Sequence, residues 1–274
     1  MGQVIDSFKS SLVIVRDNPV ILGVAFVSGL LGLGSLLSDS SKAFSFTSTI
    51  LYTIPFFVGP FFGGGLLGMV VEATEKPTKL STFIESGKRN YVSLLKAVAL
   101  FFAILLCLII GTGIIVGLPA GIVLILLPKG APLFKLIFLL FIATIAIVVF
   151  LIAIMLIQFY DIGIVVHHYG AWEAFRKSFA FARPRLLSVF YYSLLKGSIG
   201  LLFAIPIIAI LVYSALQIWA EAGLRGLAEA PIFMSMSMPS IALFLLLETI
   251  LSAILTTFHG VFYLRSQSDK SPSQ

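Results

Sequence analysis

The feature that most constrains this chain is a series of long apolar runs. Five of them contain no charged residue and are each about 20 residues or longer, namely 19–38, 43–71, 97–128, 136–160 and 197–220. A sixth, residues 230–264, contains one charged residue, Glu248. About 20 apolar residues cross the hydrocarbon core of a bilayer as a helix, so the runs predict an all-α, polytopic membrane protein.

The composition agrees with a protein that is solvated by lipid. Hydrophobic residues make up 59% of the chain and charged residues 11%, and the mean hydropathy is +1.10. A soluble domain is about 25% charged, because its surface must be hydrated. The chain therefore cannot be an ordinary soluble enzyme, a disordered protein or a nucleic-acid-binding domain, despite its net charge of +6.

We divide the runs into six crossing helices within one domain, residues 1–265, followed by a short polar tail, 266–274. The helices are expected at about 19–38, 48–71, 95–117, 136–160, 189–217 and 240–264. The run 97–128 is too long for one straight crossing. We therefore expect a break near Gly117, after which residues 118–128 lie in the interface or re-enter the membrane.

The basic residues predict the orientation, because Lys and Arg concentrate on the cytoplasmic side of membrane proteins. With six crossings, most of the 18 basic residues fall on the side that carries both termini. The exceptions are Lys42, Lys129, Lys135 and Arg225. We therefore expect a multi-pass protein of the cell membrane with both termini in the cytoplasm.

A Phe-x-x-Ser pattern occurs three times on that side, each time inside a basic segment that precedes two apolar runs. It comprises Phe8 and Ser11, Phe83 and Ser86, and Phe175 and Ser178. The pattern predicts one unit used three times, in which a basic amphipathic helix on the cytoplasmic interface precedes a transmembrane hairpin. Chance similarity between juxtamembrane helices is the alternative.

Basic side chains of the second and third units are candidates for binding lipid headgroups. They are Lys88, Arg89, Arg176, Lys177, Arg183 and Arg185. Long basic side chains extend from an apolar helix face to anionic phosphates. Anionic lipid of the inner leaflet is therefore the expected partner, and no nucleic acid is expected.

Several of these segments together resemble a known family. They are Arg16-Asp17-Asn18-Pro19, the glycine-rich second run, residues 83–91, and Asp161 before residues 173–179. Over nearly its whole length the chain is similar to six-helix integral membrane proteins related to the membrane domain of glycerophosphoryl diester phosphodiesterases. The resemblance implies a membrane domain alone. The phosphodiesterase activity does not carry over, because no polar stretch here could form that enzyme's soluble barrel.

Glu248 heads a polar stripe along the sixth run. Ser252, Thr256, His259 and Tyr263 follow at offsets that keep all five side chains on one helix face. An ionised carboxylate in the membrane costs about 3 kcal/mol on insertion scales, so Glu248 should face water, face other helices or be protonated. The stripe is either a proton or cation path with Glu248 as its titrating group, or a set of hydrogen bonds between helices.

The second run contains two pairs of glycines four residues apart, Gly59 with Gly63 and Gly64 with Gly68. Such pairs let two helix backbones approach closely, so we expect these four to pack against another helix. Pro55 and Pro60 in the same run, and Pro206 in the fifth, leave open a broken helix of the kind that lines transporter sites.

No motif predicts a cofactor or a metal site. Asp161 lies near His167 and His168, but a metal needs three or four ligands at defined spacing. We expect Asp161 and Glu72 to pair instead with Lys88, Arg89 or Arg176.

The sequence favours a protein that is not an enzyme, because an intramembrane enzyme would need a second reactive group beside Glu248. The only candidate, His259, lies about 16 Å away along the helix. A transport or lipid-handling module, in which the Glu248 stripe lines a polar cavity, is the first hypothesis. The alternative is a scaffold that docks partners or shapes the bilayer, with the stripe sealed inside.

Overall fold

A computed structural model describes residues 1–37, 46–126, 132–229 and 237–268, and within these ranges the chain is helical and has no strand. The helices are α1 (Gly2–Asp17), α2 (Pro19–Leu37), α3 (Phe46–Ala73), α4 (Leu80–Leu126) and α5 (Pro132–Ile157). They continue with α6 (Tyr160–His167), α7 (Ala171–Ala182), the 3-10 turn η2 (Arg183–Arg185), α8 (Leu186–Glu229) and α9 (Met238–Ser268).

Five helices of the described part are long and apolar enough to cross a membrane. The number rises to six if α1 and α2, which meet at an angle of 90°, count as one broken span. The all-α class and the presence of several apolar helices of membrane-spanning length are therefore confirmed.

Several expected boundaries differ from the structure; α8, for example, continues beyond residue 217 to Glu229. α4 does not break near Gly117 but runs through it and through Pro119 to Leu126, since an apolar helix tolerates glycine and the loss of one N–H donor. α9 likewise continues beyond residue 264 to Ser268. The rest of the expected tail, 269–274, lies outside the described residues, as do Lys42, Lys129 and the end of the expected outer segment.

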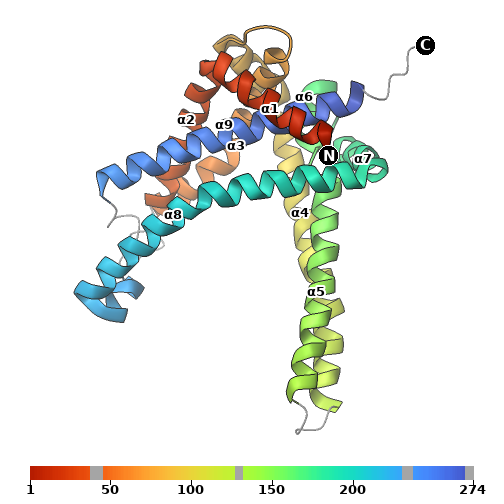
Figure 1. Cartoon of the computed structure of the whole chain (residues 1–274), viewed down its shortest axis with the longest axis vertical. Helices are drawn as coiled ribbons and strands as arrows, with labels where there is room; N and C mark the ends of the chain where they lie inside the picture. Colours follow the sequence, from red (N-terminus) through yellow and green to blue (C-terminus); the bar gives the residue numbers. More distant parts are fainter. Residues whose placement is uncertain (38–45, 127–131, 230–236, 269–274) are drawn as a thin grey trace.

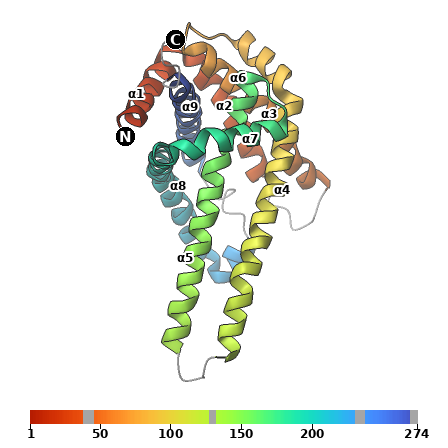
Figure 2. The same ribbon diagram turned by 90° about the vertical axis from the view of Figure 1, so that its right-hand side faces the viewer.

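The core forms where the ends of α3, α6 and α9 meet. These three helices contact one another, and each carries another helix on its outer side: α4 packs on α3, α7 on α6, and α1 on α9. α4 and α5 leave this core side by side in both views, and α8 leaves in a different direction (Figures 1 and 2).

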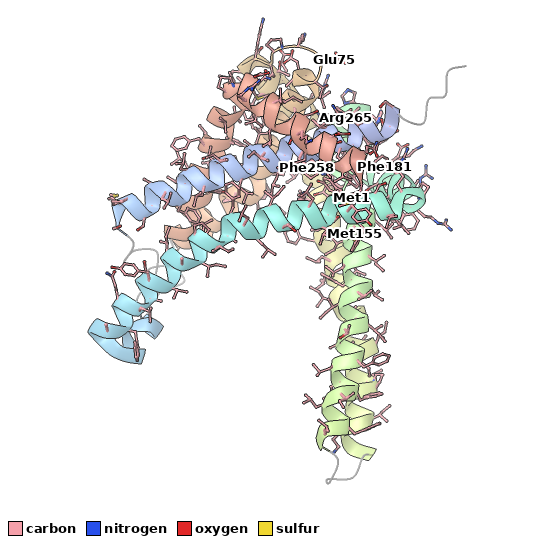
Figure 3. The ribbon with its side chains drawn as sticks, in the orientation of Figure 1. Met1, Glu75, Met155, Phe181, Phe258 and Arg265 are labelled. Carbon is pink, nitrogen blue, oxygen red and sulfur yellow. The ribbon has the colours of Figure 1, made fainter. Side chains whose placement is uncertain are left out.

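Aromatic side chains fill the core. Phe159, Tyr192, Phe258 and Phe262 are among the largest side chains with almost no exposed surface. Phe258 of α9 and Phe181 of α7 lie at the junction from which α5 descends below Met155 (Figure 3). Beyond that junction the apolar stretches of α4 and α5 are not buried against the rest of the described chain.

The amphipathic segments bury one face each. In α1 the buried residues are Val4, Ser7, Ser11 and Val15, which recur every three or four residues, as expected for one side of a helix. α1 is separate from α2 and η2 separates α7 from α8, whereas the basic segment of the second unit is the continuous start of α4.

The second and third Phe-x-x-Ser patterns occupy matching positions. Ser86 Oγ donates to the carbonyl of Gly64 at 2.9 Å, and Ser178 Oγ donates to the carbonyl of Leu156 at 3.0 Å. Each serine reaches back 22 residues, Ser86 to α3 and Ser178 to the end of α5. Ser11 is also buried but donates within α1, to the carbonyl of Phe8.

Only two of the four candidate packing glycines lie at a helix interface. A Cβ atom at Gly64 would come within 2.6 Å of Leu94 Cδ1, and one at Gly68 would overlap the Ser86 side chain. A Cβ atom at Gly59 or Gly63 would meet nothing within 4 Å. The expectation therefore differs from the structure for Gly59 and Gly63, because α4 packs on the opposite face of α3, which carries Gly64 and Gly68.

We predict that Gly68→Ala destabilises the protein by about 1–3 kcal/mol, because the new methyl group must displace Ser86 and its hydrogen bond to Gly64. The matched control is Gly59→Ala on the same helix, which should be neutral or slightly stabilising. Unfolding of the detergent-solubilised protein by SDS titration measures both. Equal stability of the two variants would contradict this interface.

Candidate functional site

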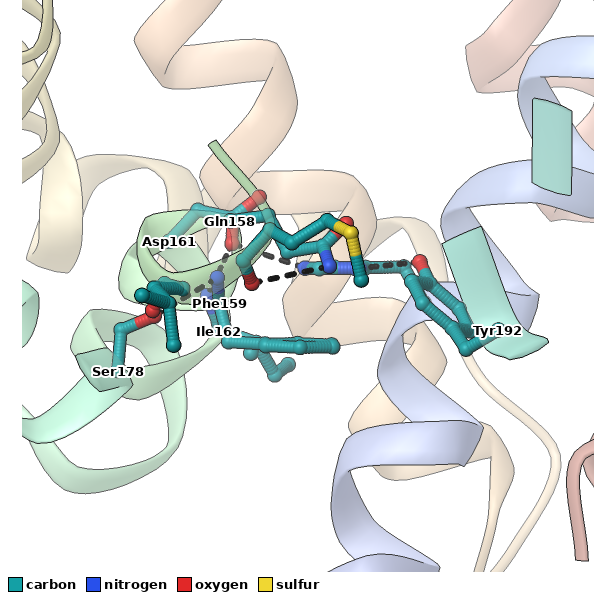
Figure 4. A network of polar contacts seen from close by, with 9 residues as sticks. Gln158, Phe159, Asp161, Ile162, Ser178 and Tyr192 are labelled. Carbon is teal, nitrogen blue, oxygen red and sulfur yellow. Dashed lines mark hydrogen bonds and ion pairs between the residues drawn. The ribbon is translucent and has the colours of Figure 1, made fainter. Parts of the chain in front are cut away.

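The site begins at the break between α5 and α6, which Ser178 of α7 bridges. Its hydroxyl donates to the Leu156 carbonyl on the α5 side and accepts the Phe159 N–H at 3.1 Å on the α6 side (Figure 4). Backbone groups at a helix break need such partners when they are buried. The bridge lets the chain change direction, so that Asp161, in the first turn of α6, faces the core.

Asp161, His259 and Tyr192 form a hydrogen-bonded chain, which we call the Asp161 network. Asp161 Oδ1 accepts the Ile162 N–H at 2.8 Å and lies 2.9 Å from His259 Nε2. The other ring nitrogen, Nδ1, lies 2.8 Å from the Tyr192 hydroxyl (Figure 4). Because a carboxylate only accepts, Nε2–H donates to Asp161, and in a neutral ring Nδ1 then accepts the Tyr192 O–H.

The Asp161 network runs from a dry interior to a wetter edge. Tyr192 has no exposed surface and His259 is 4% exposed. Phe159 stacks on the imidazole with a centroid distance of 5.1 Å and almost parallel rings. The Asp161 side chain, in contrast, is 32% exposed. The buried part therefore holds the carboxylate in one position, and the carboxylate is the part that a ligand or water can reach.

Asp161 faces a pocket of about 170 Å³, which we call the core pocket. Its polar lining comes from three helices: Asp161 of α6, Lys196 of α8, and Thr256 and His259 of α9. The rest of the lining is apolar and belongs to α3 and α9: Gly63, Leu66, Leu67 and Leu255. An acid, a base and an imidazole thus share one small pocket in a mainly apolar protein.

The structure divides the expected polar stripe of α9. Thr256 and His259 line the core pocket, whereas Tyr263 is buried among aromatic side chains. Glu248 lies against α2, where its carboxylate is close to Gly29. Ser252 is half-buried. Two of the five stripe residues thus belong to the surroundings of the Asp161 network, and the path headed by Glu248 stays a prediction.

The expected partners of the two acids also differ from the structure. Asp161 pairs with His259, and Glu72 pairs with Lys76 at 3.2 Å. Glu72 also accepts hydrogen bonds from Thr78, in the turn after α3, and from Thr82, in the first turn of α4. Among the described residues, neither acid pairs with Lys88, Arg89 or Arg176, because those side chains point away from the core and are exposed.

The candidate lipid-binding residues fall into two groups. Five of them are exposed, namely Lys88, Arg89, Arg176, Lys177 and Arg183. Arg185 is half-buried, donates to the Ser266 carbonyl at 2.7 Å and lies over the Phe181 ring. It fastens η2 to the end of α9, so we assign Arg185 a structural role.

No set of three or more metal-ligating side chains gathers anywhere in the described residues. His167 and His168 lie near the Gln267 and Asn90 side chains, at 3.3 Å in each case, and not beside Asp161.

Tyr192 and Lys196 were not predicted to belong to a site, and Asp161 and His259 were expected in separate places. One feature of the sequence could have indicated that Asp161, His259 and Lys196 lie near one another, namely their expected depth in the membrane. Asp161 follows the fourth expected crossing and His259 lies near the end of the sixth, so both stand at the same depth of the membrane. Lys196, at the start of the fifth, shares that depth. Depth alone does not say which helices are neighbours, and that is why the pair was not predicted.

We predict that Tyr192→Phe destabilises the protein by about 1–3 kcal/mol, because it leaves His259 Nδ1 buried without a donor. Tyr191→Phe, at the neighbouring half-buried position, is the control and should cost less than this. SDS titration compares the two variants. If Tyr192→Phe matches the control, the hydrogen bond from Tyr192 does not support the network.

Comparison with curated proteins and with solved structures gives no match. A family model does match, over residues 3–266 and thus over nearly the whole chain; it is described as a domain of unknown function, DUF7847. The comparison names no relative, so the resemblance to the membrane domain of glycerophosphoryl diester phosphodiesterases stays a prediction. The chain belongs to the DUF7847 family.

Proposed function

We propose that this protein is a non-enzymatic transport or lipid-handling module of the cell membrane, with six crossings and both termini in the cytoplasm. The observation that carries the proposal is the core pocket, which brings Asp161, Lys196 and His259 together among apolar helices. Ionisable groups within a membrane protein are expensive and are typical of substrate or ion pathways. In this proposal the polar cavity is the core pocket, whereas the sequence predicted a cavity lined by the Glu248 stripe.

Two further features support a role at the inner leaflet. The exposed basic residues of α4, α7 and η2 belong to helices that pack around the core, while the apolar parts of α4, α5 and α8 extend away from it. Half-exposed apolar side chains such as Phe141 and Leu202 suit a lipid environment and not water. The basic residues would then meet anionic phosphates at the cytoplasmic surface.

A structural scaffold remains the second candidate function. The complete hydrogen bonding of His259, at both ring nitrogens, favours it, because a satisfied buried histidine can simply join helices. The two functions differ in whether water enters the core pocket. A scaffold has no need of a hydrated pocket, whereas transport or lipid handling does.

We predict that Thr256→Cys in a Cys107→Ala background reacts with a membrane-impermeant thiol reagent in sealed vesicles, because Thr256 lines the core pocket. Thr257→Cys is the matched control at the next position, where the side chain has no exposed surface, and it should react only after denaturation. Mass spectrometry of the labelled protein gives the result. Equal protection at both positions would favour the sealed scaffold.

We predict that replacing Lys88, Arg89, Arg176, Lys177 and Arg183 together with Gln lowers retention of anionic lipid. Each basic residue near a charged membrane surface contributes about 1 kcal/mol. The control replaces Lys9 and Lys79 with Gln, which lie outside this set. Native mass spectrometry of protein extracted from vesicles counts the bound phosphatidylglycerol. Unchanged retention in the fivefold variant would remove the anionic-lipid partner from the proposal.

A further inference from the structure

Two opposite charges face the core pocket without touching. Asp161 and Lys196 both line it, and they are close enough to interact electrostatically. Their nitrogen and oxygen atoms do not come within the 4.0 Å of an ion pair, since the ion pair of Asp161 is made to His259. The core pocket, which both side chains line, therefore offers space for another group that contacts the carboxylate and the ammonium.

Each charge has hydrogen-bonding capacity that the described residues leave unused. The hydrogen bonds to the Asp161 carboxylate all end on Oδ1, from the Ile162 N–H and from His259, so Oδ2 stays free for a donor. The Lys196 ammonium lies 5.7 Å from the centre of the Tyr192 ring and makes no hydrogen bond to the described residues. An ammonium has three N–H donors, and a group that it can bind must be an acceptor.

The opposite wall of the core pocket adds no further charge. It consists of the Gly63 backbone and of leucine side chains, and Thr256 supplies one hydroxyl. A pocket that is lined by an acceptor, a separate group of donors and apolar side chains is complementary to a ligand with the reverse polarity. A simple cation would be repelled by Lys196 and a simple anion by Asp161.

We propose that the core pocket binds a small zwitterionic group, one that carries a primary ammonium and a phosphate or carboxylate. The ammonium donates to Asp161 Oδ2, and the anionic oxygen accepts from Lys196. This is the chemistry of an ethanolamine phospholipid headgroup and also of free phosphoethanolamine. A volume of about 170 Å³ holds about five water molecules, or a compact group of this size.

The inference rests on the proposed function, because a transport or lipid-handling module needs a place for polar cargo. It concerns different residues, however. The exposed basic residues of α4, α7 and η2 are tested by retention of anionic lipid, whereas the core pocket is tested by binding of a zwitterion. A negative result for anionic-lipid retention therefore does not affect the interpretation of zwitterion binding, and the reverse also holds.

The experiment uses the full chain purified in detergent and isothermal titration calorimetry. The probes are phosphoethanolamine and the short-chain lipid dihexanoyl phosphatidylethanolamine. Phosphocholine and dihexanoyl phosphatidylcholine are the matched control probes, because their quaternary ammonium has no N–H to donate. We expect an ethanolamine probe to bind and the choline probes to bind at least tenfold more weakly, a difference of about one charge-assisted hydrogen bond.

Three variants test the site. Asp161→Asn and Lys196→Gln each remove one charge and should weaken binding about tenfold or more. Gly63→Leu leaves both charges in place but fills the core pocket, because a side chain at Gly63 has open space before it. Gly59→Leu, which also faces open space on α3 but lies outside the core pocket, is its control.

Asp6→Asn and Lys9→Gln on α1 are the controls for the loss of one charge, because both side chains are exposed and neither lines the core pocket. Lys196→Gln and Gly63→Leu keep the test decisive if Asp161→Asn does not fold. If phosphoethanolamine binds, the ligand of the core pocket is a soluble zwitterion. If only dihexanoyl phosphatidylethanolamine binds, the ligand is a lipid headgroup. Absence of binding by both ethanolamine probes, or full binding by Lys196→Gln and Gly63→Leu, overturns the proposal.

Discussion

Helices as apolar as these cannot rely on the hydrophobic effect to find one another in a membrane, because lipid tails are as apolar as leucine side chains. Close backbone packing and hydrogen bonds must hold them together instead. The protein uses both at its core. Gly68 brings α3 against Ser86 of α4, Ser178 ties α7 to the break after α5, and His259 joins α9 to Asp161. Each of these three contacts joins helices at the core.

The same polar contacts explain why the functional groups gather at one place. The break that Ser178 stabilises directs α6 into the core. If α5 continued without this break, it would carry Asp161 away from the core pocket. α8 brings Tyr192 and Lys196 from another direction, four residues apart on one helix face. The core pocket therefore exists because three helices converge, and no single helix carries a complete site.

Much of the fold was predictable from the sequence, because a charge-free run of about 20 residues has few structural solutions in lipid. The packing contacts of Gly64 and Gly68 followed from the four-residue spacing of the glycines. The sequence did not predict that α4 continues past Gly117, since glycine and proline mark possible breaks and not certain ones. It also could not separate Gly63, which faces the core pocket, from Gly64, because four-residue spacing fits both pairs.

The site was harder to predict, for a physical reason. The stripe from Glu248 to Tyr263 follows from the period of one helix, and a single sequence reveals such a pattern. The bond between Asp161 and His259 joins residues 98 positions apart and depends on which helices are neighbours. Hydropathy carries no information about neighbours within the membrane. The residue types therefore indicated which side chains could form polar contacts, but the sequence did not predict that Asp161 and His259 lie together.

The packing of α1 on α9 bears on the order in which the protein is made. α1 is synthesised before the other described helices, yet the partner of its buried face is α9, the last of them: Phe8 packs on Phe258, and Arg265 donates to Ser10 at 2.7 Å. Until α9 is synthesised, the face with Ser7 and Ser11 has nothing to cover it except the membrane interface. Closing the core therefore has to wait until α9 has been synthesised, and a chain that stops before α9 would leave α1 without its main packing partner.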